Sequence, residues 1–132
     1  MLLLAKYNFS IVRSTRIHVN HALLVNKGTK FEDVKEIFSH EQAIKQCSEF
    51  LSKLKNVKVT VCENTAMAAK MVAESDRRDI AAISSKLCAE LYSLDVADEA
   101  IQNVGNNYTR FICISKELEI YPGANRTSLM IV

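Results

Sequence analysis

Three connections in the sequence place small polar or charged residues between an apolar run and a helical pattern. They are residues 38–40 (Phe-Ser-His), 63–65 (Glu-Asn-Thr) and 83–85 (Ile-Ser-Ser). If the apolar runs are parallel strands, all three connections lie at the carboxyl edge of one sheet, where open α/β sheets bind ligands. Helix N-termini at that edge offer unpaired N–H groups and a partial positive charge. The pattern therefore predicts a crevice suited to a carboxylate or a phosphate.

The same residues also have a purely structural interpretation. Serine, asparagine and threonine are common helix N-caps. Ser39 followed by Gln42 forms a capping-box pattern, in which each side chain bonds the backbone of the other. On the residues alone, capping is the commoner role of such positions.

The elements that must position these residues follow from periodicity. Alternating or β-branched apolar residues predict strands at 9–12, 17–25, 34–38, 57–62, 80–83, 94–97 and 110–115. Helical spacing predicts helices at 39–54, 65–73 and 85–92, with a turn at 26–29 and a polar loop at 98–108. The order predicts an α/β fold whose sheet is mixed, mostly parallel and flanked by helices.

Composition excludes several classes of protein. The chain of 132 residues is long enough for one domain with a core, and its net charge of +2 gives no case for binding nucleic acid or a membrane surface. Residues 1–5 are apolar but too short for a signal peptide, and they resemble the end of a helix. The four cysteines have no metal-binding spacing and lie in apolar patterns, so we expect buried, reduced thiols, no metal site and a cytoplasmic protein: Cys47, Cys62, Cys88 and Cys113.

Several motifs, taken in order, resemble the prephenate dehydratase family. They are residues 21–24 (His-Ala-Leu-Leu), 39–47 (Ser-His-Glu-Gln-Ala-Ile-Lys-Gln-Cys), 63–65 (Glu-Asn-Thr) and 107–111 (Asn-Tyr-Thr-Arg-Phe). The Thr-Arg-Phe run is the most specific, whereas each of the others is weak alone. Glu41 stands where many members have proline, and a first helical turn accepts either residue.

The resemblance implies a fold and a reaction. The fold is one lobe of a type II periplasmic-binding-protein-like architecture, in which the active site lies in a cleft between two lobes. The reaction is the loss of carbon dioxide and water from prephenate, which gives phenylpyruvate during phenylalanine biosynthesis. No cofactor is expected, because aromatisation of the ring drives the reaction.

The resemblance also suggests two catalytic residues. Thr109 lies where an Asn-rich loop meets a strand, and its hydroxyl would donate a hydrogen bond to the leaving hydroxyl or relay a proton to it. Glu63 would order neighbouring groups in the cleft or steer acid chemistry. On the residues alone, Thr109 is a β-branched residue beginning a strand, and Glu63 is a charge favourably placed before a helix.

Five further residues are expected to bind the substrate: Ser39, Gln46, Gln42, His40 and Arg110. Gln46 lies one turn after Gln42 and would hold a substrate oxygen with its amide. Arg110 could hold a carboxylate with two parallel hydrogen bonds, but it points away from Thr109 if the strand is regular. Phe111 and Cys47 are expected in the core.

The family's first lobe carries a glycine-rich segment and a Glu-Asn-Ser/Thr motif of its own, apart from the one matched by residues 63–65, and neither has a counterpart in the sequence. We therefore expect residues 1–115 to form part of the catalytic domain, namely its second lobe and a return strand. Residues 116–132 are expected to be a linker and the truncated start of the regulatory ACT domain. The partners of this fragment would be the missing lobe and the ACT domain, and we expect little activity from the chain alone.

Two other functions remain open on the sequence. The chain could be a non-catalytic module of the same fold that binds small anions. It could also be an interaction domain that forms a homodimer through an apolar surface. Fold analogy cannot choose among these, and the motifs favour the dehydratase.

Overall fold

The computed structural model describes residues 6–105 and 107–125, and it divides into two units. One unit is a two-stranded ribbon made by the two ends of the chain, and the other is a globular α/β unit of residues 19–107. The helix end expected at residues 1–5 lies outside the described residues, and so does the end of the expected ACT segment, residues 126–132.

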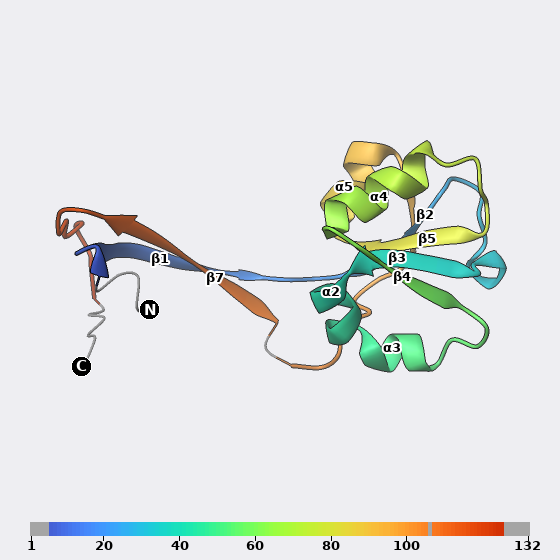
Figure 1. Cartoon of the computed structure of the whole chain (residues 1–132), viewed down its shortest axis with the longest axis horizontal. Helices are drawn as coiled ribbons and strands as arrows, with labels where there is room; N and C mark the ends of the chain where they lie inside the picture. Colours follow the sequence, from blue (N-terminus) through green and yellow to red (C-terminus); the bar gives the residue numbers. More distant parts are fainter. Residues whose placement is uncertain (1–5, 106, 126–132) are drawn as a thin grey trace. The chain divides into compact units, whose positions relative to one another are not determined.

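The ribbon pairs β1 (Ser10–His18) with β7 (Tyr108–Ser115) in antiparallel fashion (Figure 1). Its register is continuous from Arg13 to His18, so successive side chains alternate between the two faces. Phe111 is 54% exposed in this ribbon, so the prediction that it belongs to the core is wrong. A two-stranded ribbon has no second layer of its own in which to bury a side chain.

The sheet of the globular unit has the strand order β4-β3-β5-β2-β6. Its strands are β2 (Ala22–Val25), β3 (Glu36–His40), β4 (Lys58–Cys62), β5 (Ile80–Ser84) and β6 (Asp95–Asp98). β3 pairs in parallel with β4 and β5, whereas β2 pairs antiparallel with β5 and β6. The predicted mixed α/β sheet is confirmed, but its pairings are parallel on one side only, because β2 runs against the other strands.

Helices cover both faces of this sheet (Figure 1). They are α2 (Glu41–Gln46), α3 (Ser48–Ser52), α4 (Thr65–Glu74) and α5 (Lys86–Tyr92), with a 3₁₀ turn η1 (Phe31–Asp33) before β3. Helices α4 and α5 pack on one face, and α2 and α3 pack on the other. The predicted helix 39–54 is therefore two short helices, which are separated at Cys47.

Two buried clusters form the core, one on each face of the sheet. Alternate residues of β2 enter them: Ala22 and Leu24 join the α4/α5 cluster, and Leu23 and Val25 join the α2/α3 cluster. All four are fully buried, which explains why β2 is a continuous apolar run and not an alternating pattern.

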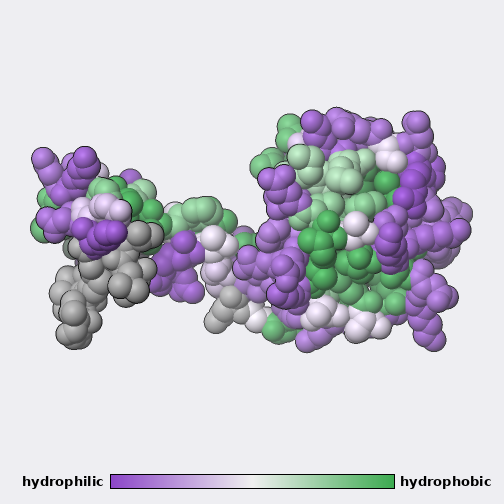
Figure 2. Space-filling view, viewed as in Figure 1, coloured by the Kyte–Doolittle hydropathy of each residue, from purple (hydrophilic) through white to green (hydrophobic). Residues whose placement is uncertain are grey.

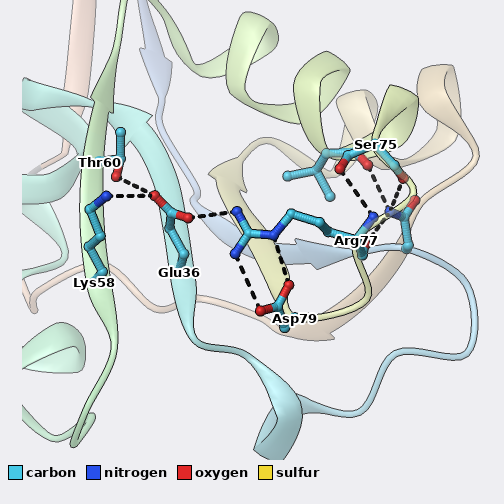
Figure 3. Close-up of polar contacts among 8 residues, drawn as sticks. Glu36, Lys58, Thr60, Ser75, Arg77 and Asp79 are labelled. Carbon is cyan, nitrogen blue, oxygen red and sulfur yellow. Dashed lines mark hydrogen bonds and ion pairs between the residues drawn. The ribbon is translucent and has the colours of Figure 1, made fainter.

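A charged network ties the amino edge of the sheet together (Figure 3). One oxygen of Glu36 lies 2.8 Å from Arg77 Nη1, and the other accepts hydrogen bonds from Thr60 at 2.7 Å and Lys58 at 3.3 Å. Arg77 Nε also lies 2.9 Å from Asp79 Oδ1. These contacts, chiefly the one with Arg77, lower the pKa of Glu36 to about 2. The network joins the starts of β3 and β4 to the segment before β5.

The visible face of the globular unit carries a hydrophobic patch with hydrophilic residues around it (Figure 2). β4 is an edge strand of the five-stranded sheet, and its Val59 and Val61 are 38% and 62% exposed. Unpaired edges that carry exposed valines can pair with other chains, so this edge is an apolar surface open to association.

Candidate functional site

The carboxyl edge of the sheet gathers the three polar connections, as predicted. β3 pairs in register with β4 and β5, so the three strands end at one edge, where α2, α4 and α5 begin. The residues that cap these helices are His40, Asn64 and Ser85. Their side chains accept a backbone N–H of the first turn at 3.2, 2.7 and 3.4 Å, respectively. Capping of the helices is thus one role of the polar residues at this edge.

The first of these caps differs from the prediction. Ser39 lies within β3, is fully buried, and donates its hydroxyl to the carbonyl of Ile83 at 2.8 Å. It does not cap α2, so the predicted capping box with Gln42 is wrong. His40 Nδ1 takes the place of the serine oxygen and accepts the N–H of Gln42. Ser39 instead ties the end of β3 to the end of β5.

A buried histidine holds the amide of Gln46. His21 is 7% exposed, and its Nε2 lies 2.7 Å from Gln46 Oε1. An amide oxygen can only accept, so His21 is the donor, and the amide nitrogen of Gln46 keeps its two N–H groups. Gln46 is half-buried at the end of α2. The pair therefore leaves a fixed amide donor at the edge of the sheet.

The polar loop that follows β6 completes this region. Gln102 Oε1 accepts the backbone N–H of His21 at 3.0 Å. Asn103 accepts the N–H of Glu49 at 3.0 Å and donates its backbone N–H to the carbonyl of Gln46 at 2.6 Å. The loop thus positions both members of the His21–Gln46 pair. The sequence predicted only a polar loop over these residues.

The other expected residues of the globular unit lie at the surface of the same edge. Gln42 is exposed in the first turn of α2, and His40 is half-buried beside it. Glu63 is exposed in the bend that joins β4 to α4. His40 is paired across the sheet with Cys62, so the turn that holds Glu63 adjoins the turn that holds His40.

Thr109 and Arg110 lie on β7 of the ribbon and are exposed. Thr109 is opposite Ile17, and Arg110 is opposite Arg16. Because β7 is regular here, the two side chains point to opposite faces of the ribbon, as the spacing predicts.

Sequence reasoning missed His21 as a site residue, although its motif was noted. The available signal was a histidine directly before a fully apolar strand. A buried histidine needs a partner for its polar atoms, and that need points to a nearby amide or carboxylate.

The cysteines do not form a site. All four are free, but only Cys47 is fully buried, and Cys113 is exposed on the ribbon, so the expectation of four buried thiols is wrong. Burial raises the pKa of Cys47 to about 11, which disfavours the thiolate needed in a nucleophile.

Within residues 6–105 and 107–125, no group of three or more His, Cys, Asp or Glu side chains is arranged to hold a metal ion. Over the same residues, no helix has the length and apolar character needed to cross a membrane.

A comparison with protein families agrees with the motifs. Residues 1–119 match the family described as prephenate dehydratase. This match covers most of the chain, which therefore belongs to the prephenate dehydratase family.

Similar proteins support the same family. The chain is 40% identical over 124 residues to arogenate dehydratase/prephenate dehydratase 2, chloroplastic, of Arabidopsis thaliana, which covers 94% of this chain and 32% of that protein. Prephenate dehydratase of Arthrobacter aurescens, solved with L-Phe, is 29% identical with a TM-score of 0.74, covering 91% of this chain and 39% of that one. A structure described as a novel type of quorum quenching acylase is 30% identical with a TM-score of 0.75, covering 93% and 44%.

The chain spans about 30% of the length of the curated relatives named here and of others like them. Its five-stranded mixed sheet, flanked by helices, is the fold of the matching part of the Arthrobacter enzyme. The fold alone does not choose the chemistry, since the acylase shares it.

Proposed function

We propose that this chain supplies part of a dehydratase active site that converts prephenate into phenylpyruvate, carbon dioxide and water. Membership of the prephenate dehydratase family supports the reaction class. The observation that carries the proposal is the His21–Gln46 pair, in which a buried histidine donates to the amide oxygen of Gln46 and leaves the amide N–H groups to act as donors. A fixed donor suits a substrate that carries two carboxylates.

The reaction needs little covalent help from the protein. The bond from the ring to its carboxylate breaks, its electrons enter the ring, and the ring hydroxyl leaves as water after it accepts a proton. The protein must hold the carboxylates, strip solvent from the one that departs, and hydrogen-bond the leaving oxygen. The donor we assign to the leaving oxygen is Thr109, which relays a proton and is not itself its source.

The remaining residues have supporting roles in this proposal. Glu63 orders groups at the turn after β4, and His40 and Gln42 line the first turn of α2. Ser39 donates its hydroxyl to the carbonyl of Ile83, so its role is to fix the ends of β3 and β5 near the substrate. Arg110 binds a carboxylate on the face of the ribbon away from Thr109.

Residues 1–115 form, in this proposal, the second lobe of a type II periplasmic-binding-protein-like catalytic domain with its return strand. Residues 116–132 form a linker and the start of an ACT domain. The chain then needs a first lobe to enclose the substrate, because half a cleft cannot exclude water. A cytoplasmic location stays a prediction, and the Arabidopsis relative is named as chloroplastic.

A chimera tests the proposal. Residues 1–119 of this chain replace the aligned region of the Arabidopsis relative, and product formation is measured with prephenate and with arogenate. We expect turnover of at least one substrate by the chimera and almost none by the chain alone. A chimera that folds, as judged by circular dichroism, yet turns over neither substrate would leave a non-catalytic anion-binding module as the better account.

A further inference from the structure

Two arginines face one another across the ribbon. Arg16 of β1 and Arg110 of β7 are directly opposite in the antiparallel register, so both side chains point to the same face. Both are exposed. Directly opposed like charges in a sheet destabilise the pairing unless another group offsets them.

An aromatic pair beside them orders one of the guanidinium groups. Tyr108 is opposite His18, and their ring centroids lie 4.9 Å apart. The guanidinium carbon of Arg16 lies 4.9 Å from the centre of the Tyr108 ring, which is the geometry of a cation–π contact. The contact favours this orientation of the Arg16 guanidinium over the ring.

No carboxylate of the described residues neutralises this pair. Ion pairs form elsewhere in residues 6–105 and 107–125, and none of them includes Arg16 or Arg110. The planar groups of two adjacent arginines match the oxygens of a carboxylate or phosphate. The cationic pair thus has the chemistry of an anion site without an anion from its own unit.

We propose that Arg16 and Arg110 form a site for a doubly charged oxyanion, on the face of the ribbon opposite Thr109. A dicarboxylate and a phosphate share this chemistry. Because the proposed function already gives Arg110 a carboxylate on this face, the inference rests on that function and adds Arg16 as the second arginine of the site.

The test follows the arginine Nε–H signals of the whole chain by nuclear magnetic resonance. Succinate and inorganic phosphate are added in separate titrations at constant ionic strength. We expect saturable shifts of the Arg16 and Arg110 signals with at least one anion, and Arg110→Gln should weaken binding roughly tenfold. The anion that binds more tightly shows whether the site prefers a dicarboxylate or a phosphate.

Arg13→Gln is the matched control, because it removes the same charge from the same strand. Arg13 is opposite Cys113, on the face that carries Thr109, and its guanidinium lies over Tyr121. Binding should be unchanged in this variant. Shifts that never saturate, or equal weakening by Arg13→Gln and Arg110→Gln, would overturn the proposal. If Arg110→Gln loses the amide signals of the ribbon, Arg110→Lys serves instead, and unchanged affinity there would also overturn it.

Discussion

Buried polar side chains serve different purposes at the two edges of the globular sheet. At the carboxyl edge, His21 donates to Gln46 and Ser39 donates to a carbonyl, and both bonds hold side chains in place. At the amino edge, Glu36 accepts from Arg77, Lys58 and Thr60, and its side chain is only 12% exposed. The bonds at the carboxyl edge position the candidate site, whereas the charged network at the amino edge stabilises the frame around it.

Glu36 should make the stability of the protein depend on pH. The pKa of Glu36 in the folded protein is about 2, below its ordinary value of 4.5. The contribution of Glu36 to the free energy of unfolding is therefore complete above pH 4.5 and is lost as the pH falls toward 2. Glu36→Gln should lower the free energy of unfolding at pH 7 by on the order of 1 kcal/mol, since Arg77 is half-exposed. Urea unfolding at pH 7 and pH 3 measures this, and the difference between the variant and the parent should shrink at pH 3.

Glu41→Gln is the control for this measurement. Glu41 also pairs with a lysine, Lys45 at 2.7 Å, but both side chains are well exposed. Its removal should change stability little at either pH. If both variants lost the same free energy of unfolding, the amino-edge network would stabilise the fold no more than an exposed ion pair does.

The sequence predicted residue types at the carboxyl edge better than their bonds. It identified residues 38–40, 63–65 and 83–85 as polar turns, and capping was confirmed at each. It assigned the first cap to Ser39 because the Ser-x-x-Gln pattern is local, whereas the actual partner of Ser39 is Ile83, on another strand. A bond between strands depends on the sheet pairing, which no local pattern contains.

At the scale of elements, the break between α2 and α3 shows a loop overriding a helical pattern. The apolar face predicted for residues 39–54 is present, with Ala43 and Cys47 buried. Asn103 accepts the N–H of Glu49 and donates to the carbonyl of Gln46, and both groups would otherwise bond within one continuous helix. A residue far along the chain therefore ends one helix and begins the next.

Asn103→Ala should destabilise this junction. It removes a side chain that bonds Glu49 and Ser48, so we expect a loss of roughly 1–2 kcal/mol in the free energy of unfolding. Amide hydrogen exchange should rise in α2 and α3 and stay unchanged in α4. Asn103→Asp keeps the acceptor for Glu49 and should retain most of the stability. Unchanged exchange in α3 of the alanine variant would contradict this role.

The predicted strand boundaries were wrong where pairing with another strand, and not the local sequence, decides where a strand begins and ends. The sequence predicted strands at 9–12 and 17–25, but β1 runs through the polar residues 13–16 because β7 supplies its hydrogen bonds. The chain then leaves strand geometry at residues 19–21 before β2 begins. The strands at 57–62, 80–83 and 94–97 were predicted to within two residues, although burial explains the apolar pattern of only the middle one, β5.

At the scale of the whole molecule, the chain consists of a ribbon and a globular unit with separate internal structure. Both buried clusters and all pairings of the five-stranded sheet lie within residues 19–107. The ribbon has mostly exposed side chains. The stability of the globular unit should therefore come from its own residues.

Residues 19–107 should fold without the ribbon. We expect cooperative thermal unfolding with a midpoint within a few degrees of the full chain, because no buried cluster is lost. Circular dichroism and amide dispersion measure this. The 19–107 segment with Leu24→Asp should fail to fold, because the substitution puts a charge in the buried α4/α5 cluster. An unfolded 19–107 segment would show that the ribbon is part of its core.

The order of motifs predicted the family, and the family match confirmed it. The sequence could not predict how the cleft is completed, because the chain spans about 30% of its curated relatives. The catalytic role of Thr109 stays a prediction from the motifs.

The most direct test is the turnover number of the chimera with Thr109→Ala, compared with Thr15→Ala. Thr15 is the same residue type on the same face of the ribbon, opposite Phe111. We predict that Thr109→Ala lowers kcat by roughly a hundredfold or more, that Thr109→Ser restores most of it, and that Thr15→Ala leaves it unchanged. Equal kcat values for Thr109→Ala and Thr15→Ala would contradict the assignment of the reaction's hydroxyl donor to this chain.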